Sequence, residues 1–306
     1  MKLKYILMTT ALLFTACHDD DVVIDEQVTG PTEMTVMSFN VLFDDPDNQY
    51  AEHNWRSRRN AVLTMINQEN PDIMCLQESM WNQMLYLADK LTAYDYVDQN
   101  VDGNDNASGL HNTIFYNKDK YTLIDNGNYW LSSQPGGLSY PWNAVDRQRR
   151  VAVWAHLKDN KTKAHFFVFN TQLNNGDTEA DQDARERSSK LNVEQMEDIV
   201  GSDSTVVICG DMYASYAISD TKREALTPYY DWMKSLRDDA PDTDNKYSFN
   251  NFDIASANVT SNHDHIFVRN ATPLKFRTLD GNYGVDYISD HYPIVSTIRI
   301  EYNEKK

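Results

Sequence analysis

The sequence predicts an α/β (α+β) fold, a four-layer α/β/β/α sandwich in which two mainly antiparallel sheets pack face to face. Three observations lead to this class. Apolar runs of strand length alternate with amphipathic helical segments, and groups of consecutive strands separate the helices. Neither a fixed-period repeat nor an internal linker divides the 306 residues into two domains. The 18 Tyr and 6 Trp suit a strand-rich core with an aromatic groove.

The predicted strands are of two kinds. Most are apolar runs that are typical of strands buried on both faces, such as MTVMSFNVLF at 34–43 and TVVIC at 205–209. Residues 150–157 alternate instead, as a half-exposed strand does. A hairpin is predicted over 113–117 and 121–124. The remaining predicted strands cover 73–78, 166–173, 247–252, 264–268, 275–279 and 294–300.

Four amphipathic helices are predicted from apolar side chains at helical spacing. They cover about 52–68, 81–91, 179–200 and 221–236. Asn70-Pro71 ends the first of them. Residues 98–108 are rich in Asn, Asp and Gly, and 130–143 combine Gly, Pro and Ser with aromatic residues, so both stretches predict loops.

The N-terminus has the pattern of a targeting segment rather than of a folded element. A charged start at Lys2 and Lys4 precedes a short apolar run and then Ala16-Cys17. This resembles a bacterial lipoprotein signal with Cys17 as the lipidated residue; the alternative is a secretory peptide cut near Ala16. The acidic run after Cys17 resembles the signal of Bacteroidetes-type surface lipoproteins, and a solvated tether is the plainer interpretation. We expect a signal peptide over 1–17, a tether over 18–32 and one domain over 33–303.

Charge and cysteine content limit the partners. The formal net charge is −18, and loss of a leader carrying Lys2 and Lys4 takes it to −20. This field repels nucleic acid and anionic membranes, so we expect contact with the membrane through the lipid anchor alone. The lipoprotein signal predicts an outer-membrane or cell-surface protein, and we expect a monomer. Cys75 and Cys209 lie in apolar strand patterns and predict core packing rather than a nucleophile or a disulfide.

Polar residues recur where apolar strands end. They are Asn40, Glu78, Asp211, Asp264 and the run Ser289-Asp290-His291. Polar groups beside a buried core cost free energy unless they are paired or coordinated. Oxygen ligands from Asn, Asp and Glu suit a hard divalent cation such as Mg²⁺, Mn²⁺ or Ca²⁺. A histidine beside an acid suits proton transfer or stabilisation of a transition state.

These strand ends belong to motifs that resemble the endonuclease/exonuclease/phosphatase family, a superfamily with a DNase I-like fold that includes nucleases, inositol polyphosphate phosphatases and sphingomyelinases. The resemblance runs in order from about 34 to 300, and SDHYP, LQE and a strand containing GD are specific in combination. The segments that carry it are VMSFNVLF, PDIMCLQES, WNAVDRQRRVAVWA, VFNTQL, VVICGDMYA, HDHIFV and SDHYPIV.

The resemblance implies a role for each site residue. Asn40, Glu78 and Asp290 would hold Mg²⁺ or Mn²⁺. Asp264 would keep the imidazole of His291 oriented and charged against a phosphoryl oxygen. Asp211 would orient or deprotonate the attacking water. Arg150 would contact the substrate, or its stem would pack along the sheet with the charge at the edge.

The sequence departs from the family pattern at three positions. Tyr213 stands where the family has an asparagine that binds the phosphoryl group, and Gln172 stands where it has a histidine. Leu110 replaces the glutamate that supports that histidine. Gln172 can donate a hydrogen bond but carries no proton near pH 7, while Tyr213 keeps a hydroxyl donor for a substrate oxygen.

Two hypotheses of function follow. The first is an extracytoplasmic, divalent-metal-dependent phosphoesterase acting on a small phosphorylated substrate. The alternative is a catalytically impaired surface lipoprotein that binds a phosphorylated or glycan-like ligand on the same fold, beside the aromatic loop at 130–142. The net charge and the lack of a Lys/Arg stripe argue against a nuclease.

Overall fold

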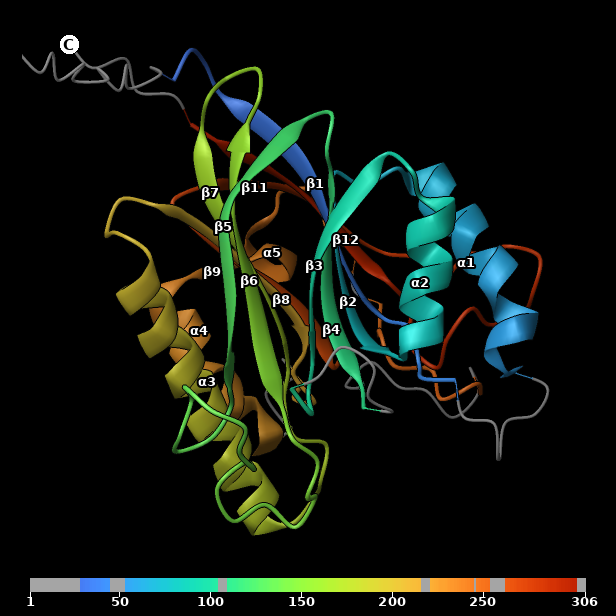
Figure 1. The fold of residues 1–306 in the computed structure, drawn as a ribbon, viewed down its shortest axis with the longest axis vertical. Helices are drawn as coiled ribbons and strands as arrows, with labels where there is room; N and C mark the ends of the chain where they lie inside the picture. The colour runs from blue at the N-terminus through green and yellow to red at the C-terminus, as the bar shows by residue number, and fades with distance from the viewer. Residues whose placement is uncertain are drawn as a thin grey trace, which may run out of the picture.

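Two six-stranded sheets and their flanking helices form the protein (Figure 1). The computed structural model describes residues 28–44, 53–103, 109–215, 221–244, 246–253 and 262–301. The first sheet has the strand order β11-β12-β1-β2-β4-β3, and the second has the order β5-β6-β7-β8-β10-β9. Among the strands that the structure describes, only β1–β2 in the first sheet and β7–β8 in the second pair in parallel. The expected pair of mainly antiparallel sheets is confirmed.

Each element has the following bounds. The first sheet contains β1 Thr32–Asn40, β2 Ile73–Ser79, β3 Tyr94–Asn100, β4 His111–Asn117, β11 Thr272–Thr278 and β12 Ile294–Ile300. The second contains β5 Tyr121–Trp130, β6 Val151–Asp159, β7 His165–Gln172, β8 Thr205–Asp211, β9 Lys234–Ser235 and β10 Asp264–Arg269. The helices are α1 Trp55–Glu69, α2 Trp81–Lys90, α3 Glu179–Ile199, the 3₁₀ helix η2 Thr221–Leu226, α4 Thr227–Trp232 and α5 Leu236–Asp239.

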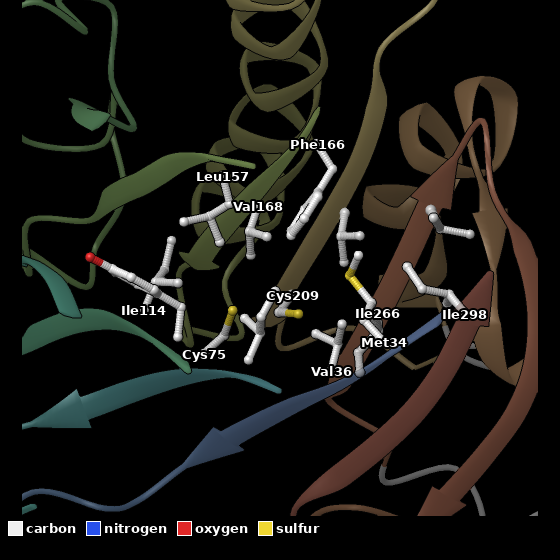
Figure 2. Close-up of a cluster of buried hydrophobic side chains, with 14 of the residues drawn as sticks. Met34, Val36, Cys75, Ile114, Leu157, Phe166, Val168, Cys209, Ile266 and Ile298 are labelled. Carbon is white, nitrogen blue, oxygen red and sulfur yellow. The ribbon is translucent and has the colours of Figure 1, made fainter. Parts of the chain in front are cut away.

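Three apolar cores separate the four layers. The central core lies between the sheets and includes Val36, Cys75, Val168 and Cys209 (Figure 2). A second core joins the first sheet to α1 and α2, and a third joins the second sheet to α3 and α4. Figure 1 shows the two helical layers on opposite sides of the molecule. Cys75 and Cys209 are buried and free, as expected from their strand patterns.

Local signals in the sequence explain where the long helices begin. Asn54 caps α1 by accepting a hydrogen bond from the Ser57 amide at 3.1 Å. Thr178 and Asp181 form a reciprocal capping box at the start of α3. Asn70 ends α1 in a left-handed conformation with φ of 44°. Among the described residues, no helix combines the length and the apolar character needed to cross a bilayer.

The structure corrects four details of the expected element order. The β1 strand begins at Thr32, the last residue of the expected tether. The β4 and β5 strands follow one another in sequence but join different sheets, so they do not form a hairpin. The expected helix over 221–236 is broken into η2, α4 and the short β9 strand. The expected strand over 247–252 makes only an isolated bridge, between Phe249 and His291.

The β3 strand was missed because its residues, YDYVDQN, alternate aromatic with polar side chains before a loop-like run. The strand forms by pairing along its whole length with β4, from Tyr94–Asn117 to Asn100–His111. A strand at the edge of a sheet takes its stability from this neighbour, which lies 11 or more residues away in the sequence.

The two parallel pairs bring the polar strand ends to one edge of the sandwich. In β1 and β2, Asn40 lies opposite Gln77, one residue before Glu78. In β7 and β8, Gln172 lies opposite Asp211, which in turn faces Asp264 on β10. Parallel strands end at the same edge of a sheet, and ligands bind at that edge.

Buried polar side chains fix the two sheets relative to each other just below this edge. The Asn170 amide on β7 donates to the Leu76 carbonyl at 2.8 Å and to the Thr113 carbonyl at 3.0 Å, both in the other sheet. Gln77 donates back to Asn170 Oδ1 at 2.8 Å. Hydrogen bonds at this depth are costly to break because water does not replace them. They hold the site residues of the two sheets in register.

Candidate active site

A buried chain of three side chains forms the centre of the site. His291 Nδ1 donates to Asp264 Oδ2 at 2.8 Å, and its Nε2 lies 3.9 Å from Asp211 Oδ2. Their ligand atoms lie within 4.8 Å of one another, a spacing that a metal ion also uses. The 2.8 Å contact is a hydrogen bond with no room for a cation between its atoms, so the group is a proton-holding chain.

Opposing effects set the protonation of this chain. Burial acts to lower the pKa of His291, but the carboxylates of Asp264 and Asp211 outweigh it and raise that pKa well above its ordinary value. Burial acts to raise the pKa of Asp211, but the positive charges of His291 and His263 and the hydrogen bond from Asn40 hold it below its ordinary value. At neutral pH the chain therefore holds a charged imidazole between two carboxylates.

Asp211 accepts hydrogen bonds from both sheets. Its Oδ2 accepts from Asn40 Nδ2 at 2.9 Å and from Gln172 Nε2 at 3.4 Å, and its Oδ1 accepts from the Tyr213 amide at 3.1 Å. The Asn40 amide is oriented by the Leu42 amide, which donates to Asn40 Oδ1 at 3.0 Å. This carboxylate is held in one orientation from both sheets, as a group that positions a reactant requires.

Glu78 is presented to the site by an irregularity in β2. The register between β2 and β4 shifts between Leu76 and Ser79, and Glu78 has a left-handed backbone with φ of 60°. Such a conformation is uncommon outside glycine, and bulges next to active sites re-aim a side chain. The Glu78 carboxylate accepts from Gln172 Nε2 at 2.6 Å.

The carboxylates near Glu78 are crowded in a way that suits a cation. Burial raises the pKa of Glu78 to about 7, with the negative charges of Asp290 and Asp211 adding to the effect. Burial also raises the pKa of Asp290. The carboxyl groups of Glu78 and Asp290 and the amide oxygen of Asn40 are donors of the kind that Mg²⁺ or Mn²⁺ prefers. The set Asn40, Glu78 and Asp290 fits such an ion, and its assignment as the metal site stays a prediction.

Arg150 is fully enclosed, so its charge does not lie at the edge of the sheet. One guanidinium nitrogen lies 3.1 Å from Asp146 Oδ2. The other two, Nε and Nη1, are buried without a hydrogen-bond partner among the described residues. The positive charge of the Arg150 guanidinium acts to lower the pKa of Glu78, against the larger effect of burial. The field of this charge therefore reaches the same site. Buried, unpartnered donors of this kind suit an anionic substrate group.

The three departures from the family pattern lie in different surroundings. Gln172 bridges Glu78 and Asp211, as described above. Tyr213 has φ of 46°, a backbone that asparagine adopts more readily than an aromatic residue. Its ring lies 5.4 Å from the Arg185 guanidinium and 4.8 Å from the His263 ring. Leu110 takes no part in the chain and lines a cavity beside it.

His263 lies beside the candidate site, a position that no pattern in the sequence indicated. Its ring lies 4.8 Å from that of Phe249 and 6.1 Å from that of His291, and its charge helps to keep Asp211 ionised. Its neighbour His265 does pack, donating to the Ala214 carbonyl at 2.7 Å. Alternation along a strand places the two histidines on one side, but His263 precedes β10, where that alternation does not apply.

Arg58 is a second residue that sequence reasoning missed. It is buried in α1 and donates to the carbonyls of Val41, Leu42 and Ile288 at 2.8, 3.1 and 2.6 Å. These carbonyls belong to the segments that carry Asn40 and Asp290, so Arg58 ties the two segments together. A charged residue on a helix is usually read as solvent-facing, and no signal in the sequence separates Arg58 from its exposed neighbours.

The geometry assigns a task to each group. Asp211 can orient a water molecule and accept its proton, and charged His291 can donate a hydrogen bond to an oxygen that gains negative charge. Asn40, Glu78 and Asp290 would hold a divalent cation, which would supply positive charge against the phosphate and the leaving oxygen. Arg150 offers its free donors to an anionic group, and Gln172 donates to the carboxylates beside it.

Comparison with known proteins shows the family of the chain. The model of the Endonuclease/Exonuclease/phosphatase family matches residues 37–291. A member of that family from Bacteroides thetaiotaomicron is similar in structure, with 25% identity and a TM-score of 0.80 over 90% of this chain and 98% of that one. A mannosyl-6-phosphatase from the same organism has 25% identity and a TM-score of 0.77, over 87% of this chain and 99% of its own.

Relatives found by sequence align over only part of this chain and part of their own length. A fungal CCR4-Not complex 3'-5'-exoribonuclease subunit Ccr4, from Phaeosphaeria nodorum, is 31% identical over 190 residues, which are 50% of this chain and 30% of that protein. An uncharacterized protein of Acanthamoeba polyphaga mimivirus is 27% identical over 58% of this chain and 66% of its own length. The chain therefore spans less than two thirds of either relative.

Proposed function

We propose that this chain, which belongs to the endonuclease/exonuclease/phosphatase family, is an extracytoplasmic phosphoesterase that uses a divalent cation, Mg²⁺ or Mn²⁺. The observation that carries the proposal is the buried chain from Asp211 through His291 to Asp264, with Glu78 and Asn40 beside it. Burying charged groups costs free energy, and at this depth they are positioned to act on a bound phosphoester.

The substrate we propose is a small phosphorylated molecule. The structurally similar mannosyl-6-phosphatase cleaves a phosphate from a sugar, as its name states. The formal net charge of −18 disfavours a long polyanion, so a phosphate monoester fits the chain better than nucleic acid. We also propose that Cys17 carries a lipid that anchors a monomeric protein at the outer membrane or the cell surface. Radiolabelled palmitate should enter the full chain and not a Cys17→Ala variant.

Phosphate release tests the catalytic proposal. Purified protein is offered sugar phosphates, nucleotides, inositol phosphates and phospholipid head groups with Mg²⁺ or Mn²⁺, and again with a chelator. We expect release that the chelator abolishes and that Asp211→Asn lowers by about 10²–10⁴-fold. Asp203→Asn, at an exposed position just before the same strand, is the matched control. Release that survives the chelator and Asp211→Asn contradicts the proposal.

The departures at Gln172, Tyr213 and Leu110 favour one alternative. A surface lipoprotein that has lost part of its catalytic machinery would bind a phosphorylated or glycan-like ligand without turnover. Losing one charge-stabilising donor costs about 10²–10³-fold in rate, so losses at two positions together would lower turnover by about 10⁴–10⁶-fold. Calorimetric binding of a ligand without product over several hours supports this alternative, and robust turnover excludes it.

A further inference from the structure

A cavity of about 440 Å³ lies beside the candidate active site. Met80, which lines it, follows Glu78 by two residues, and Arg149 directly precedes the buried Arg150. Leu110 lines it next to β4, which pairs with the end of β2. The cavity therefore opens at the same edge of the sandwich as the proposed phosphate site, and its volume is within the range of small-molecule pockets.

Aromatic and charged side chains alternate on its walls. The guanidiniums of Arg149 and Arg147 lie 4.3 and 5.1 Å from the Tyr140 ring. Arg149 Nη1 lies 2.6 Å from Asp102 Oδ1. Tyr140 is 40% exposed and Phe43 is 38% exposed, which is high for large aromatic residues and leaves apolar faces open toward a ligand.

The walls are held in place without a ligand. Buried Gln83 accepts from the amides of Asp44 and Met80, each at 2.9 Å, and donates to the Leu42 carbonyl at 2.9 Å. A Cβ at Gly109, which also lines the cavity, would lie 2.6 Å from Asp102 Oδ2, so glycine is needed there for the Asp102 carboxylate to keep its place. A preformed pocket saves the ordering cost of binding.

We propose that this cavity binds the uncharged organic part of the phosphoester substrate and that this part is a monosaccharide ring. The proposal rests on the proposed function, since the phosphate would lie at the neighbouring site. The two guanidiniums of the cavity are balanced by the carboxylates of Asp102 and Asp44, which suits a neutral ligand. Hydroxyl groups both donate to carboxylates and accept from guanidiniums.

The apolar surface of the cavity agrees with a sugar. The C–H faces of a pyranose are apolar while its rim is polar, and Phe43, Leu110 and Tyr140 offer matching apolar surface. Leu110 places an apolar side chain in this wall. A sugar phosphate would thus meet hydrogen-bonding groups at its rim and apolar groups at its face.

The test compares substrates that differ only in the ring. We measure kcat/KM for mannose 6-phosphate and glucose 6-phosphate against ethyl phosphate, which has no ring to fill the cavity. We expect the preference for the hexose phosphates to fall at least ten-fold in Arg149→Ala and in Tyr140→Ala, mainly through KM. Arg187→Ala, an exposed arginine paired with Asp183 at 2.8 Å, is the matched control and should keep the preference.

A binding experiment separates this proposal from the hydrolase proposal. Saturation-transfer NMR measures binding of methyl α-mannoside and methyl α-glucoside to the wild-type chain and to Arg149→Ala. Glycoside binding that is lost in Arg149→Ala without cleavage of any phosphoester supports the cavity and overturns the hydrolase. Phosphoester cleavage with no glycoside binding, and with an unchanged preference in both folded variants, overturns the cavity and leaves the hydrolase.

Discussion

Replacing Glu78 by glutamine should stabilise the metal-free protein at alkaline pH. The pKa of Glu78 is raised from 4.5 to about 7, first by burial and then by Asp290 and Asp211. The folded state therefore binds this proton more tightly than the unfolded state. The stability that this tighter proton binding contributes is fully present below the unfolded-state pKa, and it is lost as pH rises through about 7.

The size of the effect follows from the pKa. At 1.36 kcal/mol per pKa unit, the difference between the folded and unfolded pKa of Glu78 corresponds to about 3 kcal/mol of lost stability at pH 8.5. The Glu78 side chain keeps partial contact with water, which screens its repulsion, so we expect about 1–2 kcal/mol. Glutamine has the same shape and still accepts the hydrogen bond that Gln172 donates at 2.6 Å, so the substitution removes charge without removing packing.

Urea unfolding of chelator-treated protein measures this difference. Glu78→Gln should be more stable than wild type by about 1–2 kcal/mol at pH 8.5 and equally stable at pH 4.5. Adding Mg²⁺ should stabilise the wild type, because binding to the folded state shifts unfolding, and should stabilise the variant much less. Glu197→Gln, an exposed position on α3, is the control. If the variant is no more stable than wild type at pH 8.5, then burial and the neighbouring carboxylates do not raise the pKa of Glu78 and this reasoning is refuted.

Three further predictions concern the groups around Glu78. Asp264→Asn removes the main charge that raises the pKa of His291. We expect activity at pH 8 to fall by about 10²–10³-fold and the alkaline limb of the pH–rate profile to move to lower pH. A limb that does not move contradicts the pairing of His291 with Asp264. Arg58→Met leaves buried carbonyls unpaired, so urea unfolding should show a loss of about 3 kcal/mol, and a loss below about 1 kcal/mol means that the ties are weak. The double change Gln172→His with Tyr213→Asn should raise phosphate release at least about ten-fold if these departures limit the rate, and unchanged release shows that they do not.

Much of the fold was predictable because its signals are local. The β8 strand, TVVICGD, is buried along its whole length, as its run of apolar residues indicates. The β12 strand has the predicted bounds, Ile294–Ile300. The α3 helix begins at Glu179, as predicted, because its start is set by local signals. The predictions were wrong where the structure of a strand depends on the strand that it pairs with. The β4 and β5 strands join different sheets, and β3 forms only against β4.

The site shows the same division. The sequence placed Asp211, Asp264 and His291 at strand ends, and the structure brings them together, with a hydrogen bond between His291 and Asp264 and an ion pair at 3.9 Å between His291 and Asp211. It did not identify Arg58 or His263, because a side chain's partners come from segments far away along the chain. Ile288, which accepts from Arg58, lies 230 residues from it.

By itself, the sequence determined the fold class, the run of buried strands and the polar groups at their ends, because burial pattern and turn chemistry act over a few residues. Only the tertiary structure decided how the groups at those ends interact. It placed Gln172 between Glu78 and Asp211, and it enclosed Arg150 with two nitrogens unpartnered among the described residues. It also set Leu110 in the wall of a cavity. Charge, burial and hydrogen bonding at these positions depend on distances between strands, which no local pattern encodes.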